Sequence, residues 1–312
     1  MKSQPLLSFG LPVYNATEEY LHQLLDSLLA QDLQNFEIVI SDNASDNGTS
    51  EICQEYARRD SRVRYHRNQE NIGQINNFNK VLELSCGKYF RWIGADDWLE
   101  SDYASRCVEI LEANEQFIGV STYQDFTHED GYIHYREYQG ERLDSPLLHV
   151  RIWRLLWFWK TGEYGVIDTI YTIMRREVLL QTLRLRFVPS MDQVLAFELV
   201  SLGRFTHVPA CLAHRRWQPF HKISKEELFQ RYGGEKYKKL FDPLGLRRSA
   251  LCWSIIQEAP LSTWEKSLCL PAILSLTMTT LRKKIYSNLR SKASRVRKTI
   301  FKKNRSSELQ TN

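Results

Sequence analysis

A buried strand, a polar loop and a helix follow one another in residues 36–59. The first part reads Phe36-Glu37-Ile38-Val39-Ile40-Ser41-Asp42-Asn43-Ala44-Ser45-Asp46-Asn47-Gly48-Thr49. The apolar run Phe36–Ile40 predicts a buried strand, and the density of Asp, Asn, Ser and Gly over Asp42–Gly48 predicts a loop. An amphipathic pattern over Thr49–Arg59 then predicts a helix.

The same alternation of strand and helix extends on both sides of this segment. Apolar runs predict further strands at 6–11 and 89–93, and a short strand is expected at 63–66. Apolar spacings of three and four predict helices at 17–31 and 75–82. Strands that alternate with helices are typical of a parallel sheet covered on both faces. A polar cluster follows each strand, and ligands of such sheets bind beyond the carboxyl ends of the strands. We therefore expect one site along this edge.

Length and charge narrow the class of protein. The 312 residues are 43% hydrophobic and 25% charged, which is typical of a globular chain with a sizeable core. The net charge is +5, but 11 of the 42 Lys and Arg lie in 282–305, where Asp and Glu are absent. Residues 1–281 consequently hold 31 basic and 36 acidic residues, a net charge of −5. The body is therefore mildly acidic, and the basic character belongs to the C-terminal tail.

Several patterns bear on the compartment. The six cysteines are scattered without CxxC spacing, which is typical of single thiols in a reducing compartment. The N-terminus lacks the basic and long apolar regions of a signal peptide, and the longest weakly polar stretch, Ser267–Leu281, is too short to span a bilayer. We expect a cytoplasmic protein without a transmembrane helix.

Six short segments, in this order and spacing, resemble family 2 glycosyltransferases: Pro12-Val13-Tyr14-Asn15, Ser27-Leu28-Leu29-Ala30-Gln31, the 36–49 segment, Asn71-Ile72-Gly73, Gly87-Lys88-Tyr89-Phe90 and Gly94-Ala95-Asp96-Asp97. The resemblance is dense over 5–105 and thinner over 106–225. It implies an α/β GT-A fold, a Rossmann-like, mostly parallel sheet flanked by helices, here with a C-terminal helical extension. It also implies a nucleotide-diphospho-sugar donor and Mg²⁺ or Mn²⁺.

The resemblance places donor-binding residues at the strand ends. It implies that Pro12 and Tyr14 meet the nucleotide base, with the tyrosine ring stacked on it, and that Asp42 accepts a hydrogen bond from the base, usually uracil. Asn43 stands where the family commonly has a second Asp, and Ala44 where it usually has Gly. The loop that passes the ribose and diphosphate corresponds to Asn71, Gly73 and Gln74.

A divalent cation would be held by Asp96 and Asp97. Adjacent carboxylates at a strand end can hold a cation that bridges a diphosphate, although an isolated Asp-Asp is more often a solvated turn or a helix start. The chain has no glycine-rich phosphate loop that would bind the diphosphate instead. Gly94 stands where many members of the family have the first Asp of the DxD motif. We expect Asp96 at the ribose and Asp97 on the metal, or the reverse.

The general base and the leaving-group contacts are expected in the second half. The resemblance implies that Asp192 is the base, with Asp168 and Glu198 as alternatives; Asp192 also suits the N-cap of a helix over 194–202. Arg215 and Arg216, within His214-Arg215-Arg216, could stabilise the charge that develops on the diphosphate, or they could form a surface basic cluster.

Two further segments leave alternatives open. The aromatic run Ile152–Trp159 is a core helix, a sugar-stacking acceptor wall or a lipid contact. In the tail, Leu281, Ile285, Leu289, Ala293, Val296 and Ile300 repeat on one helical face, as expected of a basic amphipathic helix. Such a helix suits an anionic membrane, and we expect 282–305 to contact one. No nucleic acid is expected as a partner. A solvated tail is the alternative.

The patterns divide the chain into four parts. We expect a glycosyltransferase domain at 1–225, with a nucleotide-sugar half at 1–105 and an acceptor half at 106–225, then a helical extension at 226–281 and the basic tail at 282–312. The expected function is metal-dependent, inverting transfer of a sugar to a hydroxyl of a saccharide or lipid-linked acceptor, in cell-surface polysaccharide or glycolipid synthesis. The enzyme would lie peripherally at the cytoplasmic face of a membrane. A non-catalytic nucleotide-sugar-binding module and a nucleotidyltransferase are the alternatives.

Overall fold

The computed structural model describes residues 4–162, 167–188, 190–217 and 246–308, with side chains described as far as Tyr286 in the last helix. The first hundred residues form the predicted alternation of strands and helices: β1 Leu7–Val13, α1 Glu18–Leu29, β2 Phe36–Asp42, α2 Thr49–Arg59, β3 Val63–Arg67, α3 Gln74–Leu84 and β4 Tyr89–Trp92. The four strands pair in parallel in the order β3-β2-β1-β4, with Leu7 opposite both Phe36 and Tyr89. The expected parallel sheet is confirmed.

The second half adds strands that the sequence patterns do not reveal. Its elements are β5 Trp98–Leu99, α4 Tyr103–Ala113, β6 Phe117–Thr127, β7 Ile133–His134, α5 Leu148–Thr161, β8 Ile173–Arg175, α6 Arg176–Gln181, α7 Met191–Leu202, β9 Arg204–Arg216, α10 Leu246–Glu258 and α11 Thr263–Glu308. The sheet continues as β4-β8-β6-β9-β5, and β7 pairs with β6. The short strands β5, β7 and β8 pair antiparallel, whereas β6 and β9 are parallel. The sheet is therefore mixed but mostly parallel.

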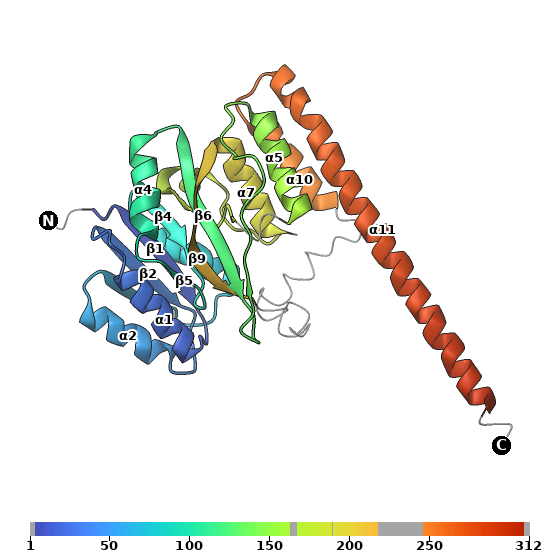
Figure 1. Ribbon diagram of the computed structural model, residues 1–312, viewed down its shortest axis with the longest axis horizontal. Helices are drawn as coiled ribbons and strands as arrows, with labels where there is room; N and C mark the ends of the chain where they lie inside the picture. Colours follow the sequence, from blue (N-terminus) through green and yellow to red (C-terminus); the bar gives the residue numbers. More distant parts are fainter. Residues whose placement is uncertain (1–3, 163–166, 189, 218–245, 309–312) are drawn as a thin grey trace.

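Apolar side chains fill both faces of the sheet. One core joins β1, β2 and β4 to α1, α2 and α4, and the other packs α3, α5, α7, α10 and the start of α11 against the opposite face. Figure 1 shows α5, α7 and α10 grouped beside the sheet at the inner end of α11. With both faces covered, polar side chains gather at the strand ends.

The aromatic segment in α5 is divided between core and surface. Ile152, Leu155 and Phe158 are buried in the core, as one of the three readings of this segment predicts. Trp153 and Trp157 are exposed on the other side of the helix. The core reading is therefore confirmed for the aliphatic face, and the two exposed tryptophans remain candidates for an acceptor contact.

The C-terminal extension is dominated by α11, a single helix of 46 residues that projects away from the body of the protein (Figure 1). Its first part is held against α5 and α10 by Cys269, Ala272, Ile273 and Leu276, all buried. The helical extension expected at 226–281 is helical from Leu246 onward, while 226–245 lie outside the described residues. The expected tail is helical as far as Glu308. Across the described residues, no helix combines the length and apolar character that a membrane span requires.

Candidate functional site

Four strand ends meet at one edge of the sheet. Asn77 of α3 ties two of them together: its side-chain amide donates to the Ser41 carbonyl oxygen of β2 at 2.9 Å and to the Val13 carbonyl oxygen of β1 at 3.3 Å. The chain leaves β1 through Pro12 and Tyr14, whose ring is 50% exposed and thus open to a stacking partner. The polar clusters expected at one site are therefore neighbours in space.

Asp42 is fully buried at the end of β2, with 0% exposure. One carboxylate oxygen accepts from the Ser45 amide at 2.9 Å and the Ser45 hydroxyl at 2.6 Å. The other accepts from the Tyr65 hydroxyl at 2.8 Å and from Arg67 at 2.9 Å. Since four donors already surround this carboxylate, it orders the loop after β2 in the structure. Its expected hydrogen bond to a base stays a prediction.

Asn43 and Asn71 join the loops that follow β2 and β3. The Asn43 amide donates to the Asn71 side-chain oxygen at 2.7 Å, and the Asn43 side-chain oxygen accepts from the backbone N–H of Ile72 at 2.9 Å. Gly73 adopts φ +83°, a left-handed conformation that glycine takes without strain. Gln74 begins α3, and its side-chain oxygen is buried without a hydrogen-bond partner among the described residues. These expected donor-site residues therefore form one connected surface.

Asp97 is a buried carboxylate, 3% exposed, just beyond β4. One of its oxygens accepts from the backbone N–H of Gly94 at 3.2 Å. Burial raises the pKa of Asp97 to about 6, although the positive charge of Arg215 opposes the shift. A Cβ atom on Gly94 would lie 2.9 Å from an Asp96 carboxylate oxygen and 3.0 Å from one of Asp97. The two carboxylates thus occupy the space that an Asp at position 94 would need.

Arg215 is the cation that faces these carboxylates. Its guanidinium lies 3.6 Å from Asp97 and 3.2 Å from Asp168, and it stacks 4.1 Å above the Tyr171 ring. Arg216 points elsewhere: it donates to the Asp96 carbonyl oxygen at 2.7 Å and lies 3.7 Å from the centre of the Tyr20 ring. Both arginines expected at the leaving group therefore lie beside the expected cation ligands.

Asp192 lies in the first turn of α7, and the helix begins one residue earlier at Met191. The expectation that Asp192 caps this helix was wrong, because Ser190 holds the N-cap position. The Asp192 side chain reaches water, yet nearby protein atoms partly desolvate it and raise its pKa, and the negative charge of Asp168 adds to the shift. Asp192 and Asp168 are therefore close enough to interact, and Asp168 is in turn paired with Arg215.

The third candidate base, Glu198, has a structural environment. One of its carboxylate oxygens accepts from the Leu183 backbone N–H at 2.9 Å, and the other pairs with Arg186 at 3.2 Å. Its side chain is largely buried in these contacts. These contacts fix the chain before α7 and give Glu198 a structural role rather than one in proton transfer at the strand ends.

Two contacts of the site were not expected from the sequence. Arg67 donates to both the Asp42 carboxylate and the Ser45 carbonyl oxygen. Tyr65 and Arg67 are two positions apart on β3 and therefore share a face of the strand, which is the pattern that could have predicted this contact. The pairing of Asp168 with Arg215 joins residues far apart in the chain. No sequence spacing indicates that contact.

The chemistry of Asp96 and Asp97 fits a hard divalent cation. Carboxylate oxygens are the ligands that Mg²⁺ and Mn²⁺ prefer. The buried Asp97 has a guanidinium nearby as its counter-charge, which shows that this position already favours a cation. The described residues also contain one group of mixed ligands, Asp125, Cys211 and His214, on another part of the sheet.

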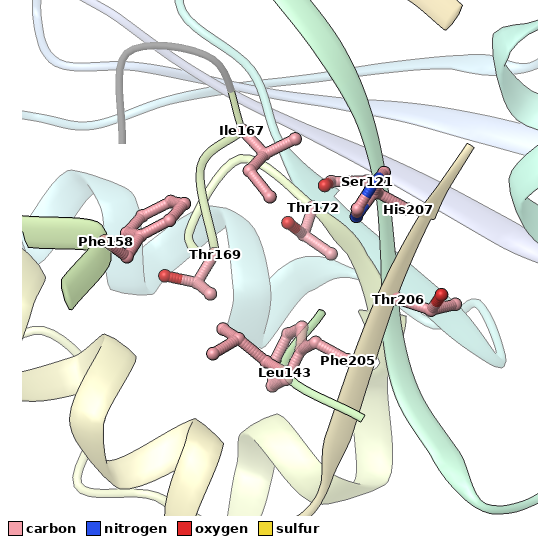
Figure 2. A pocket seen from close by; sticks show the side chains of 9 residues that line it. All are labelled: Ser121, Leu143, Phe158, Ile167, Thr169, Thr172, Phe205, Thr206 and His207. Carbon is pink, nitrogen blue, oxygen red and sulfur yellow. The ribbon is translucent and has the colours of Figure 1, made fainter. Parts of the chain in front are cut away.

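A small cavity lies behind the Asp168 loop, between α5 and the strands β6 and β9 (Figure 2). Its volume is about 20 Å³, and Ile167, Thr169, Thr172 and His207 form part of its wall. This volume holds one water molecule and no sugar.

Comparison with known proteins finds similar sequences among glycosyltransferases. An uncharacterized glycosyltransferase of Haemophilus influenzae is 30% identical over 180 residues, which cover 57% of this chain and 54% of that protein. The putative teichuronic acid biosynthesis glycosyltransferase TuaG of Bacillus subtilis is 33% identical over 135 residues, covering 42% and 53%. This chain thus spans about half the length of either relative.

The fold is also shared with a solved glycosyltransferase-type structure. Residues 1–349 of S. aureus TarS, crystallised with UDP, superpose with a TM-score of 0.59 at 15% identity, over 84% of this chain and 69% of that one. The sheet and its flanking helices are accordingly a GT-A fold, as the sequence resemblance implied. The sequence model described as Glycosyl transferase family 2 matches residues 8–183, more than half of the chain. The protein therefore belongs to glycosyl transferase family 2.

Proposed function

We propose that this protein transfers a sugar from a nucleotide-diphospho-sugar, with a UDP-sugar favoured, to a hydroxyl group of a saccharide or lipid-linked acceptor. The observation that carries the proposal is the cluster of Asp97, Arg215 and Asp168 at the strand ends, with Asp192 close to Asp168. It would supply a cation site, a fixed positive charge and a carboxylate base within one region. Metal-assisted, inverting sugar transfer from a diphosphate uses these three groups together.

The donor would lie across the ends of β1, β2 and β4. The exposed ring of Tyr14 offers a flat surface to the base, and Pro12 shapes the strand end beside it. The ribose and diphosphate would pass along the joined loops, where the Gln74 side-chain oxygen has no partner among the described residues. The residues assigned to the nucleotide-sugar are Pro12, Tyr14, Asp42, Asn43, Asn71, Gly73, Gln74, Asp96, Arg215 and Arg216.

Asp97 and Asp96 would hold Mg²⁺ or Mn²⁺. When bound, the ion would neutralise the diphosphate and assist its departure. Arg215 and Arg216 flank these two carboxylates and would add fixed positive charge as the leaving group becomes more negative. This charge is already in place before reaction, which lowers the cost of reorganisation.

Asp192 would accept the proton of the acceptor hydroxyl, and attack from the face opposite the leaving group would invert the anomeric centre. Partial desolvation and the charge of Asp168 raise the pKa of Asp192, which makes its carboxylate a stronger base at neutral pH. Asp168 is less suited to the role, because its carboxylate is paired with Arg215 at 3.2 Å.

Binding and turnover separate the two carboxylate roles. We expect Asp97→Asn to abolish the gain in UDP affinity that Mn²⁺ produces in calorimetry. Asp192→Asn should keep that binding and lose at least a hundredfold in the turnover of UDP-sugars. Asp130→Asn, an exposed Asp in the turn before β7, is the matched control for both. Wild-type turnover by Asp192→Asn would refute the base, and Mn²⁺-dependent binding by Asp97→Asn would refute the metal ligand.

The same measurements decide between the alternatives. A non-catalytic module would bind UDP-sugars without releasing UDP, and a nucleotidyltransferase would form a nucleotide-sugar from a nucleoside triphosphate. The absence of an Asp at position 94 is the feature that favours the non-catalytic module. UDP release from a panel of UDP-sugars, with simple saccharides as acceptors, would exclude both.

We also propose that α11 holds the enzyme at the anionic cytoplasmic face of a membrane, where 282–305 would contact lipid. Arg282, Lys283 and Lys284 are exposed, and Leu274 and Met278 form an exposed apolar strip on the side of α11 away from its buried face. Such a combination matches acyl chains beneath anionic head groups. The similarity to TuaG, a putative teichuronic acid biosynthesis glycosyltransferase, supports a place in cell-surface polysaccharide synthesis.

Vesicle sedimentation tests this attachment. Wild-type protein should sediment with vesicles containing an anionic lipid and stay in solution with purely zwitterionic vesicles. Charge reversal at Lys283 and Lys284 should weaken the binding, while reversal of the exposed Lys160 on α5 should leave it unchanged. Equal binding to both kinds of vesicle would contradict the electrostatic contact.

A further inference from the structure

A second cluster of metal-binding side chains lies on strands β6 and β9, on the face of β9 opposite to Arg215. The imidazole Nδ1 of His214 is 3.0 Å from both carboxylate oxygens of Asp125. Cys211 completes the group, and one ligand atom from each of the three residues lies within 4.8 Å of the other two. Neighbouring residues of a strand point to opposite faces, so His214 points away from the carboxylates that Arg215 contacts.

An irregularity in strand pairing brings the group together. Cys211 and His214 are three positions apart, and in a regular strand they would point to opposite faces. Tyr123 pairs with Cys211, but Gln124 pairs with Ala213, so β9 carries one extra residue between them. This bulge returns His214 to the face that Cys211 and Asp125 share. The sequence spacing of these residues conceals the site for the same reason.

The spacing and chemistry of the ligands suit zinc. A tetrahedral zinc ion with bonds of about 2.0–2.3 Å separates its ligand atoms by roughly 3.3–3.6 Å. The three atoms here lie within 4.8 Å of one another, so binding zinc requires the longer separations to shorten by roughly 1 Å. Imidazole, thiolate and carboxylate are ligands of Zn²⁺, whereas Mg²⁺ and Mn²⁺ favour oxygen alone. The side chains of Asp125 and His214 are each 13% exposed, so the group is sheltered yet reachable from solvent.

The second nitrogen of His214 is held as in many metal-binding histidines. Its Nε2 lies 2.9 Å from a carboxylate oxygen of Glu100. The ring stacks on Trp98 with 5.0 Å between centroids and 14° between planes. A carboxylate on the far nitrogen orients the imidazole and makes the other nitrogen a better ligand. The ring is therefore oriented with Nδ1 toward Asp125 and Cys211.

We propose that Asp125, Cys211 and His214 bind one Zn²⁺ ion, with Glu100 as the outer carboxylate and solvent in the fourth position. The thiolate and carboxylate balance the charge of the ion. This zinc joins β6 to β9 directly behind Arg215 and so steadies the strand that carries the leaving-group arginines. It is a site separate from the cation of Asp96 and Asp97.

Protons compete with the metal at this site. Burial and the charge of Asp125 raise the pKa of the Cys211 thiol to about 12. Burial opposes protonation of His214, but the hydrogen bonds and charges of Asp125 and Glu100 raise its pKa overall. Zn²⁺ binds the thiolate form of cysteine and the neutral form of histidine.

Metal analysis of the purified full chain tests the site. After chelation, incubation with Zn²⁺ and desalting, mass spectrometry should find about one equivalent in the wild type. Cys211→Ser and His214→Gln should each lose at least nine-tenths of it, and Glu100→Gln should weaken binding about 10–100-fold. The controls are Cys86→Ser, which removes an exposed thiol, and Asp97→Asn; both should keep the zinc.

A second measurement guards against variants that fail to fold. Co²⁺ added to the wild type should give a visible spectrum with thiolate charge transfer, which Cys211→Ser should lack while keeping the wild-type far-ultraviolet circular dichroism. Absence of stoichiometric zinc in the wild type, or unchanged zinc in folded Cys211→Ser, overturns the proposal. Neither measurement uses a nucleotide-sugar, so the zinc site and the proposed transferase activity can fail independently.

Discussion

Replacing Arg215 by Met tests whether the carboxylates beside it form the cation site. The guanidinium lies 3.6 Å from Asp97 and 3.2 Å from Asp168. At an effective dielectric constant of about 20, each attraction amounts to about 5 kcal/mol before the cost of desolvating the charges. Methionine keeps an apolar side chain over Tyr171 but leaves the buried Asp97 without that partner.

The net loss is smaller than the gross attraction. Removing one member of a buried charge pair costs about 3–5 kcal/mol, and Arg215 and Asp168 are each about one-fifth exposed, which reduces it. We expect Arg215→Met to lose about 2–4 kcal/mol of unfolding free energy. For a chain of this size that corresponds to a melting temperature lower by about 4–8 °C.

A divalent cation should recover part of this loss. Because Arg215 and a metal ion compete for the Asp97 carboxylate, Mn²⁺ should raise the melting temperature of Arg215→Met by more than it raises that of the wild type. The assay is thermal unfolding in a chelator and in excess Mn²⁺. Arg216→Met is the matched control, since Arg216 contacts the Asp96 carbonyl oxygen and the Tyr20 ring rather than the carboxylates. Equal Mn²⁺ responses in the wild type and in Arg215→Met would refute the shared site.

Three further perturbations follow from the same contacts. Burial lowers the pKa of His207 from 6.5 to about 4. Its contribution to the unfolding free energy is therefore complete above pH 6.5 and is lost as the pH falls toward 4. Urea titrations should show about 3 kcal/mol of this acid-dependent loss in the wild type and none of it in His207→Gln. Gly94→Asp should weaken Mn²⁺-dependent UDP binding roughly tenfold (about 1.4 kcal/mol), because its Cβ would lie 3.0 Å from an Asp97 carboxylate oxygen. Tighter UDP binding by this variant in calorimetry would contradict such crowding. Asp42→Asn turns an amide toward hydrogen-bond donors, so chemical denaturation should show a loss of about 2–4 kcal/mol of unfolding free energy. Tyr65→Phe should lose about 1 kcal/mol. Equal losses would show that the carboxylate does not organise the loop.

Local patterns predicted the first half of the fold and most of the donor edge. The apolar runs of β1, β2 and β4 are buried on both faces, so each of these strands stands out from the polar loops around it. Parallel strands joined by helices must place their carboxyl ends at one edge, which is why Asn43 and Asn71 could be expected near one another. Their hydrogen bond at 2.7 Å agrees with that expectation.

Other features depend on contacts between distant segments. The strands β5, β7 and β8 have two or three residues each, too few for a periodic pattern. The orientation of Asp42 inward, onto Tyr65 and Arg67, depends on how β3 pairs with β2. The pairing of Arg215 with Asp168 depends on how the loop before β8 approaches the end of β9.

The sequence by itself determined the class of fold, the edge of the sheet that holds the site and the separation of a basic helical tail from an acidic body. Those features follow from hydrophobic periodicity and charge within short windows, which act before distant parts of the chain meet. Only the tertiary structure decided that Arg215 faces Asp97, and that Asp125, Cys211 and His214 converge. Each of these groupings requires β9 to pair with its neighbours in one register, and packing of the whole sheet, with a bulge in β9, selects that register.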